Sequence, residues 1–162
     1  MNTQEIKQLY HYNSWANNKY FDAVSQVPAD QYLQDMKSSH GGLHGTFLHI
    51  IAAQKMWLSR WNGTPDKALV KQDEIQTLAD LKSLWQKVEA DTSSMLETIT
   101  DEKLLQSMTM TTTKGDTYVH TYAQMMQHLV NHSSYHRGQL AALLRQLNIK
   151  PPSTDFIAFL RH

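Results

Sequence analysis

Three histidines recur at intervals of four residues within the stretch 121–147, TYAQMMQHLVNHSSYHRGQLAALLRQL. This pattern predicts a long helix that carries His128, His132 and His136 one turn apart. Each histidine then lies ~40° around the helix axis and ~6 Å further along it than the one before. Because a zinc–nitrogen bond is only about 2.0 to 2.1 Å long, the ~12 Å of rise between His128 and His136 prevents them from sharing one ion. At most one adjacent pair can chelate.

The apolar side of this helix indicates which pair that is. With Leu129 as the reference direction, His136 lies at about −20°, His132 at about −60° and His128 at about −100°. His132 and His136 are therefore expected to point into a helical core, with His128 on its flank. Buried imidazoles are costly unless their nitrogens are bonded, and a metal ion bonds them efficiently. The alternative is a pair of core histidines bonded to backbone groups or tyrosine.

Three other long segments show helical spacing of apolar residues. The first follows a capping box formed by Asn2 and Glu5 and ends before Pro28, the second spans residues 43–61, and the third follows a capping box formed by Thr77 and Asp80. Each amphipathic segment must bury its apolar side against others, so we expect an all-α four-helix bundle.

Shorter elements are predicted between and after these helices. Asp30 is expected to cap a short helical turn, and Thr100 or Asp101 to begin another. The β-branched threonines of 108–113 and 117–120 flank Lys114-Gly115-Asp116, which predicts a short β-hairpin or extended insertion before the last long helix. The apolar tail that follows the prolines at 151 and 152 is expected to pack back on the bundle.

Composition narrows the class of protein. A chain of 162 residues without an internal repeat or linker fits one domain, residues 1–162. The absence of cysteine excludes disulfides, thiolate zinc sites and a cysteine nucleophile. Acidic and basic residues both number 15, which does not favour nucleic acid or an anionic membrane as a partner. No apolar run approaches the ~18 residues that span a bilayer, so a cytoplasmic protein is expected.

A catalytic zinc site commonly has three protein ligands and one open position, so His132 and His136 need a partner from another element. The candidates are five histidines elsewhere in the chain: His11, His40, His44, His49 and His120. The apolar pattern of segment 43–61 mildly favours His44 over His49. Because that segment is apolar almost all round, the pattern leaves the choice open.

Three motifs resemble those of a known family, the DinB/YfiT-like four-helix metal proteins, which are unrelated to the DNA polymerase of the same name. The motifs are NHSSYHRGQ at 131–139, His49-Ile50 followed by Trp57-Leu58 in segment 43–61 and by Gly63 just after it, and NSWAN at 13–17. The first is the most specific, and the resemblance extends over essentially the whole chain. The resemblance implies that His49, His132 and His136 bind a divalent metal ion such as zinc or nickel. It also implies a homodimer.

The resemblance further implies a reaction class, because several members act as thiol S-transferases or isomerases with low-molecular-weight thiols. Three neutral imidazoles leave the charge of a dication unneutralised, which acidifies a bound water or thiol. We therefore expect a metal-bound thiol or water to be the reactive group, with a small-molecule thiol and an electrophilic substrate as partners. The alternative is a non-catalytic metal- or ligand-binding protein, such as a stress-response accessory protein.

Trp57, Tyr135 and Arg137 are the candidates for a substrate pocket, with Arg137 available to a substrate carboxylate. Each has a structural alternative, since tryptophans on helices are more often core residues and arginines more often pair with protein groups. Asn13, Trp15, Asn17 and Asn131 are expected to have structural roles.

Overall fold

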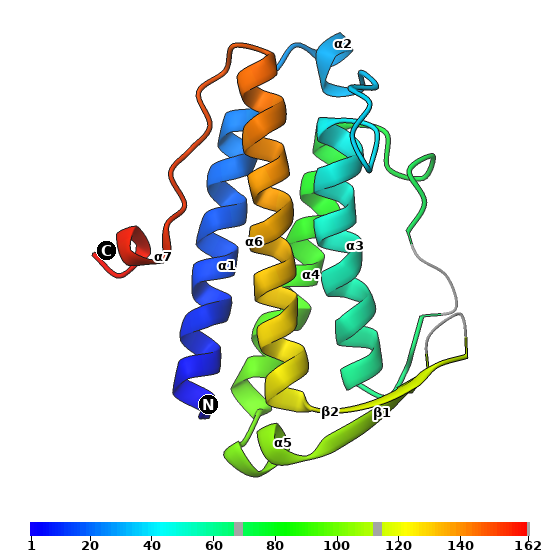
Figure 1. Cartoon of the computed structure of the whole chain (residues 1–162), viewed down its shortest axis with the longest axis vertical. Coiled ribbons are helices and arrows are strands. Elements are labelled where there is room, and N and C mark those ends of the chain that lie inside the picture. The colour runs from blue at the N-terminus through cyan, green and yellow to red at the C-terminus, as the bar shows by residue number, and fades with distance from the viewer. Residues whose placement is uncertain (67–69, 112–114, 162) are drawn as a thin grey trace.

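The computed structural model describes residues 1–66, 70–111 and 115–161 of the chain. Four long helices lie side by side in a bundle (Figure 1): α1 (Thr3–Val24), α3 (Leu43–Trp61), α4 (Leu78–Thr98) and α6 (Tyr122–Gln146). The shorter elements are α2 (Ala29–Tyr32), α5 (Asp101–Leu105), β1 (Ser107–Thr111), β2 (Thr117–Thr121) and α7 (Phe156–Phe159). The predicted all-α bundle with a hairpin before its last long helix is confirmed.

The helices begin where their capping residues place them. Asn2 and Glu5 form a capping box at the start of α1, Thr77 and Asp80 at the start of α4, and Thr121 and Gln124 at the start of α6. These reciprocal bonds satisfy backbone N–H groups that have no partner inside the helix.

The role predicted for Asp30 is wrong. Helix α2 begins at Ala29 after Pro28, whose φ of −54° and ψ of 144° make it the last extended residue. Asp30 lies instead in the first turn, where a carboxylate interacts favourably with the positive end of the helix dipole. The other short turn begins as predicted, with the Thr100 side chain accepting a bond from the Lys103 backbone N–H.

The connection between α3 and α4 crosses over instead of forming a tight turn. Phe21, near the end of α1, packs on Phe47 near the start of α3 at 4.2 Å between ring centroids, and on Trp85 near the start of α4 at 6.3 Å. Helices α3 and α4 therefore start at the same end and run in the same direction, while α1 and α6 run the opposite way (Figure 1). The end of α3 and the start of α4 therefore lie at opposite ends of the bundle.

Helix α6 packs against both α1 and α3, and α4 packs against α3. The inward side of α6 supplies Met126, Leu129, Leu140 and Leu144, all fully buried. They meet Ile6 and Ala16 of α1 and Phe47, Ile50 and Ile51 of α3 in one apolar core. The angular position predicted for the apolar side of α6 therefore holds, and it fixes which way the histidines of this helix face.

The hairpin lies across one end of the bundle (Figure 1). Strands β1 and β2 pair antiparallel from Ser107 opposite Thr121 to Thr111 opposite Thr117. Because α6 begins directly after β2, the hairpin lies beside the first turns of that helix. Three residues of the predicted hairpin, Thr112, Thr113 and Lys114, fall outside the described part of the chain.

The C-terminal tail packs against α1, as predicted. The Tyr12 hydroxyl donates to the Thr154 carbonyl at 2.9 Å, and the Tyr12 ring meets Phe156 edge-on at 5.1 Å. Within the described ranges, every helix is too short or too polar to cross a bilayer.

A buried polar layer links all four long helices. The Arg137 guanidinium of α6 donates to the side-chain oxygens of Asn13 at 2.6 Å and Asn17 at 2.9 Å, both on α1. Asn13 donates onward to Gln54 of α3 at 3.1 Å, and Gln54 donates to Glu89 of α4 at 3.1 Å. Buried polar groups need such partners, so this chain of bonds restricts how the helices can pack around the site.

Candidate metal centre

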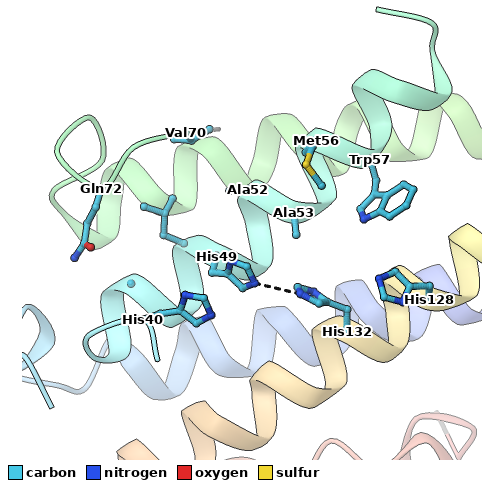
Figure 2. A pocket seen from close by; sticks show the side chains of 12 residues that line it. His40, His49, Ala52, Ala53, Met56, Trp57, Val70, Gln72, His128 and His132 are labelled. Carbon is cyan, nitrogen blue, oxygen red and sulfur yellow. Dashed lines mark hydrogen bonds between the residues drawn. The ribbon is translucent and has the colours of Figure 1, made fainter. Parts of the chain in front are cut away.

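Imidazoles from α3 and α6 meet between the two helices. The Nε2 atom of His132 lies 3.1 Å from Nε2 of His49 and 3.1 Å from Nε2 of His136. His132 and His136 are one turn apart on α6, and the close packing of α3 on α6 brings His49 opposite them. Figure 2 shows His49 and His132 facing each other from their separate helices. The three residues predicted to form the site therefore come together at one point.

A hydrogen bond fixes the orientation of the His136 ring. Its Nδ1 atom lies 2.8 Å from Oε1 of Gln139, one turn further along α6. An amide oxygen only accepts hydrogen bonds, so Nδ1 carries the proton and Nε2 keeps its lone pair. That lone pair faces His132. The Gln139 amide in turn donates to the Ser39 hydroxyl at 3.4 Å, in the loop before α3.

Burial favours the neutral form of His40, His49 and His132. Desolvation is the largest cause and neighbouring imidazoles add to it, and together they lower the pKa of both His49 and His132 to about 4. The pKa of His40 is lowered by the same two causes. At neutral pH these rings therefore offer lone pairs instead of N–H⁺ donors, which is the state that binds metal ions.

A fourth histidine, His40, stands beside the cluster. One ring nitrogen from each of His40, His49 and His136 lies within 4.8 Å of the other two, close enough for these three histidines to hold a metal ion. The His40 ring is stacked on that of His49, with 3.9 Å between centroids and 17° between planes. His40 comes from the loop between α2 and α3, so the candidate centre combines two helices with one loop (Figure 2).

The donor set fits a divalent ion. Two nitrogens that are 3.1 Å apart, each about 2.1 Å from a common ion, subtend an angle of about 95° at that ion, between octahedral and tetrahedral values. Three converging Nε2 atoms cannot all be satisfied by one another, because an Nε2–H placed between two acceptors bonds fully to only one of them. Nδ1 of His132 is buried without a hydrogen-bond partner among the described residues, so no protein group fixes the tautomer of this ring. A bound cation would satisfy the lone pairs that the protein leaves facing each other.

A cavity of about 420 Å³ opens beside the cluster. His40, His49 and His132 line it at one end, and Trp57 and His128 lie at the other (Figure 2). Small molecules therefore have space next to the imidazoles. His128, predicted on the flank of α6, is exposed at this position.

The predicted pocket residues have different surroundings. Trp57 lines the cavity. Tyr135 is mostly exposed, with its ring 5.1 Å from that of His136. Arg137 is buried in the core, where its guanidinium is bonded to Asn13 and Asn17, and it does not line this cavity. Asn13 and Asn17 have the structural roles expected of them.

The remaining candidate histidines lie away from the cluster. The Nδ1 atom of His44 is 2.8 Å from the Tyr32 hydroxyl, so this buried ring belongs to the contact between α2 and α3. The mild preference of the apolar pattern for His44 over His49 was therefore misplaced. His120 lies on the exposed β2 strand, and His11 is exposed on α1.

Two features of the cluster were not singled out by the sequence. His40 was one of five candidates for a third ligand, but nothing marked it as a fourth imidazole beside His49. Gln139 was noted only as part of a motif, although its spacing of three residues from His136 places it on the same side of a helix. That spacing is the signal that could have identified it.

Comparisons with known proteins agree with the resemblance in the motifs. The model of the DinB family matches residues 1–162. Protein DinB of Bacillus subtilis strain 168 is 25% identical over 160 residues, which cover 94% of this chain and 92% of that protein. The uncharacterized protein YizA of the same strain is 25% identical over 152 residues, covering 94% of each chain.

A solved structure supports the fold. The crystal structure of a DinB-like protein from Bacillus cereus ATCC 10987 matches with a TM-score of 0.68 and 19% sequence identity. The match covers 93% of this chain and 95% of that one, so the similarity extends over the whole bundle.

Proposed function

Because this chain belongs to the DinB family, we propose that it is a metal-dependent S-transferase that activates a low-molecular-weight thiol. In this proposal His49, His132 and His136 hold one divalent ion, zinc or nickel. The single observation that carries it is the position of the His132 Nε2 atom, 3.1 Å from Nε2 of both His49 and His136 and beside an open cavity.

Each residue has a defined part. The three imidazoles bind as neutral donors, which the lowered pKa values of His49 and His132 favour. Gln139 holds the His136 ring in the tautomer that presents Nε2. A divalent ion bound there supplies positive charge that stabilises a thiolate over a thiol.

The transfer itself is a nucleophilic substitution. The thiol loses its proton to solvent, its sulfur lone pair forms a bond to an electrophilic carbon, and the leaving group departs with the electron pair of the bond that breaks. No oxidant or reductant is needed. Since the chain has no cysteine, the sulfur comes from a separate small molecule that enters the cavity.

One observation favours the alternative of a non-catalytic metal-binding protein. If His40 bound together with the other three histidines, the ion would have four protein ligands, the arrangement typical of structural zinc. The two functions therefore differ in whether a coordination position stays open.

The test uses the purified chain loaded with cobalt(II), whose visible spectrum reports coordination. We expect one ion per chain, and a new sulfur-to-cobalt charge-transfer band when a small thiol is added. The H132A/H136A double variant should lose both the ion and the band, whereas H120A, which removes an exposed histidine, should keep them. A double variant that retains the ion would refute the site, and a metal-loaded protein that binds no thiol would refute the transferase.

A further inference from the structure

A second cavity, of about 760 Å³, lies between α3, α6 and the β-hairpin. Trp57 of α3 and His128 of α6 line both this cavity and the one beside the histidine cluster. Their rings meet edge-on, with 5.8 Å between centroids. In Figure 2 these two residues lie at the end of the first cavity that is away from His40. The two cavities are therefore neighbours separated by one pair of side chains.

The walls of the second cavity combine apolar surface with one guanidinium. Met110, Tyr118, Met125 and Trp57 supply most of the apolar lining. Arg60 also lines it, and its guanidinium carbon lies 5.4 Å from the centroid of the Trp57 ring. The cation is therefore held near the boundary between the two cavities.

Arg60 has no carboxylate partner within the described part of the chain. Among the residues that the structure describes, neither cavity is lined by Asp or Glu. The undescribed segments 67–69 and 112–114 contain no acidic residue either. Half-buried cations without partners favour anionic ligands. The other titratable residues of the two walls are histidines and Tyr118.

From these observations we infer that the second cavity is a subsite for an apolar, carboxylate-ended part of the substrate. A molecule bound by its sulfur at the histidine cluster extends along the surface of Trp57 and His128, which line both cavities, lays its apolar body against Met110 and Met125, and places its carboxylate at Arg60. This inference rests on the proposed function and adds the substrate class to it.

The geometry sets the length of such a molecule. Trp57 follows His49 by eight residues, which is ~12 Å along the axis of α3. Arg60 folds back over Trp57, so its guanidinium lies near this level. A carboxylate at the end of a medium-length alkyl chain reaches it, whereas the carboxylate of a very short thiol does not.

The experiment titrates cobalt-loaded protein with mercaptopropionate, mercaptooctanoate and mercaptooctanol, following the sulfur-to-cobalt band. We expect mercaptooctanoate to bind about ten- to a hundredfold more tightly than mercaptooctanol, the effect of one charge-assisted hydrogen bond. R60Q should remove this difference. R145Q makes the same change at an exposed position of α6 and should preserve it. An equal affinity for the two long thiols, or a preference that survives in R60Q, would overturn the subsite.

A second arm keeps the subsite testable if no thiol binds the metal. Octanoate, which has no sulfur, is titrated by calorimetry into the same full-length protein. Binding in wild type and R145Q but not in R60Q supports the subsite even when the S-transferase proposal has failed. No octanoate binding, or binding that R60Q does not weaken, refutes the subsite while a thiol band still supports the proposed function. Two controls exclude misfolding as the cause of lost binding in R60Q. The circular dichroism spectrum of R60Q should match that of wild type, and the R60K variant, which keeps the positive charge, should still bind octanoate.

Discussion

Replacing Gln139 tests whether the histidine cluster is prepared for a metal ion by the protein around it. The amide oxygen of Gln139 accepts a 2.8 Å bond from Nδ1 of the buried His136 ring. In Q139L this acceptor is replaced by an apolar group of similar size. The ring then either keeps a buried N–H without a partner or moves its proton to Nε2, which blocks the lone pair that faces His132.

Both outcomes weaken metal binding. A buried unsatisfied donor costs about 1 to 3 kcal/mol, and loss of a partner to a ligating histidine typically lowers metal affinity 10- to 100-fold, or about 1.4 to 2.7 kcal/mol. We therefore expect the zinc dissociation constant of Q139L to rise by about one to two orders of magnitude. Q139E retains an acceptor and adds negative charge behind the ring, so its affinity should equal or exceed that of wild type.

The assay is a competition titration of zinc between the protein and a chromophoric chelator at neutral pH. Q127L is the matched control, because Gln127 is exposed on the same helix. It should bind zinc like the wild type. The reasoning is refuted if Q139L binds zinc within about twofold of wild type, well below the expected effect, or if Q139E weakens binding as much as Q139L does.

Three other predictions concern stability and His40. Burial raises the pKa of Glu89, so the folded state holds its proton to higher pH than the unfolded state, whose carboxyl titrates near 4.5. The stability of the wild-type protein should therefore fall as pH rises above this value. At pH 7, E89Q should melt at a higher temperature than wild type, and its melting temperature should no longer depend on pH in this way. A lower melting temperature for E89Q would contradict the role given to burial of this carboxyl. A Cβ on Gly45 would lie 1.9 Å from the His40 carbonyl oxygen, so G45A should lower the free energy of unfolding in urea by about 1 to 3 kcal/mol. G138A, with no heavy atom within 4 Å of its Cβ, should instead be neutral or stabilising, and equal effects would contradict the clash. H40A should keep one zinc ion per chain with less than about tenfold weaker binding, and complete loss of the ion would contradict a triad of His49 and the two α6 histidines.

The ends of the long helices could be predicted because their signals are local. Asn2 with Glu5, Thr77 with Asp80, and Thr121 with Gln124 are capping pairs within a single turn, and each forms in the structure. The path of the chain between helices could not be predicted in this way. Helical periodicity gives the buried side of each helix but not its direction, so the parallel arrangement of α3 and α4 required the structure.

The same distinction applies to the candidate site: some of its residues could be identified from the sequence, and others only from the structure. His132 and His136 were identified because α6 is apolar on one side only, which gives each residue an angle relative to the core. Helix α3 is buried almost all round, so no such angle distinguished His44 from His49. The structure separates them by their partners, Tyr32 for His44 and the α6 histidines for His49. Only the family motif selected His49 from the sequence.

His40 had no periodic signal at all because it lies in a loop, yet its position decides between an open and a closed site. An imidazole nitrogen binds a metal ion along its lone pair, which lies in the plane of the ring. Two rings stacked 3.9 Å apart with 17° between their planes do not point their lone pairs at one another's ligand position, so His40 and His49 would share one ion only after one ring turns. Without that turn, an ion held by His49 leaves His40 unbound. An ion held by His49 and the α6 pair would keep a coordination position free toward the cavity, where a thiol needs it.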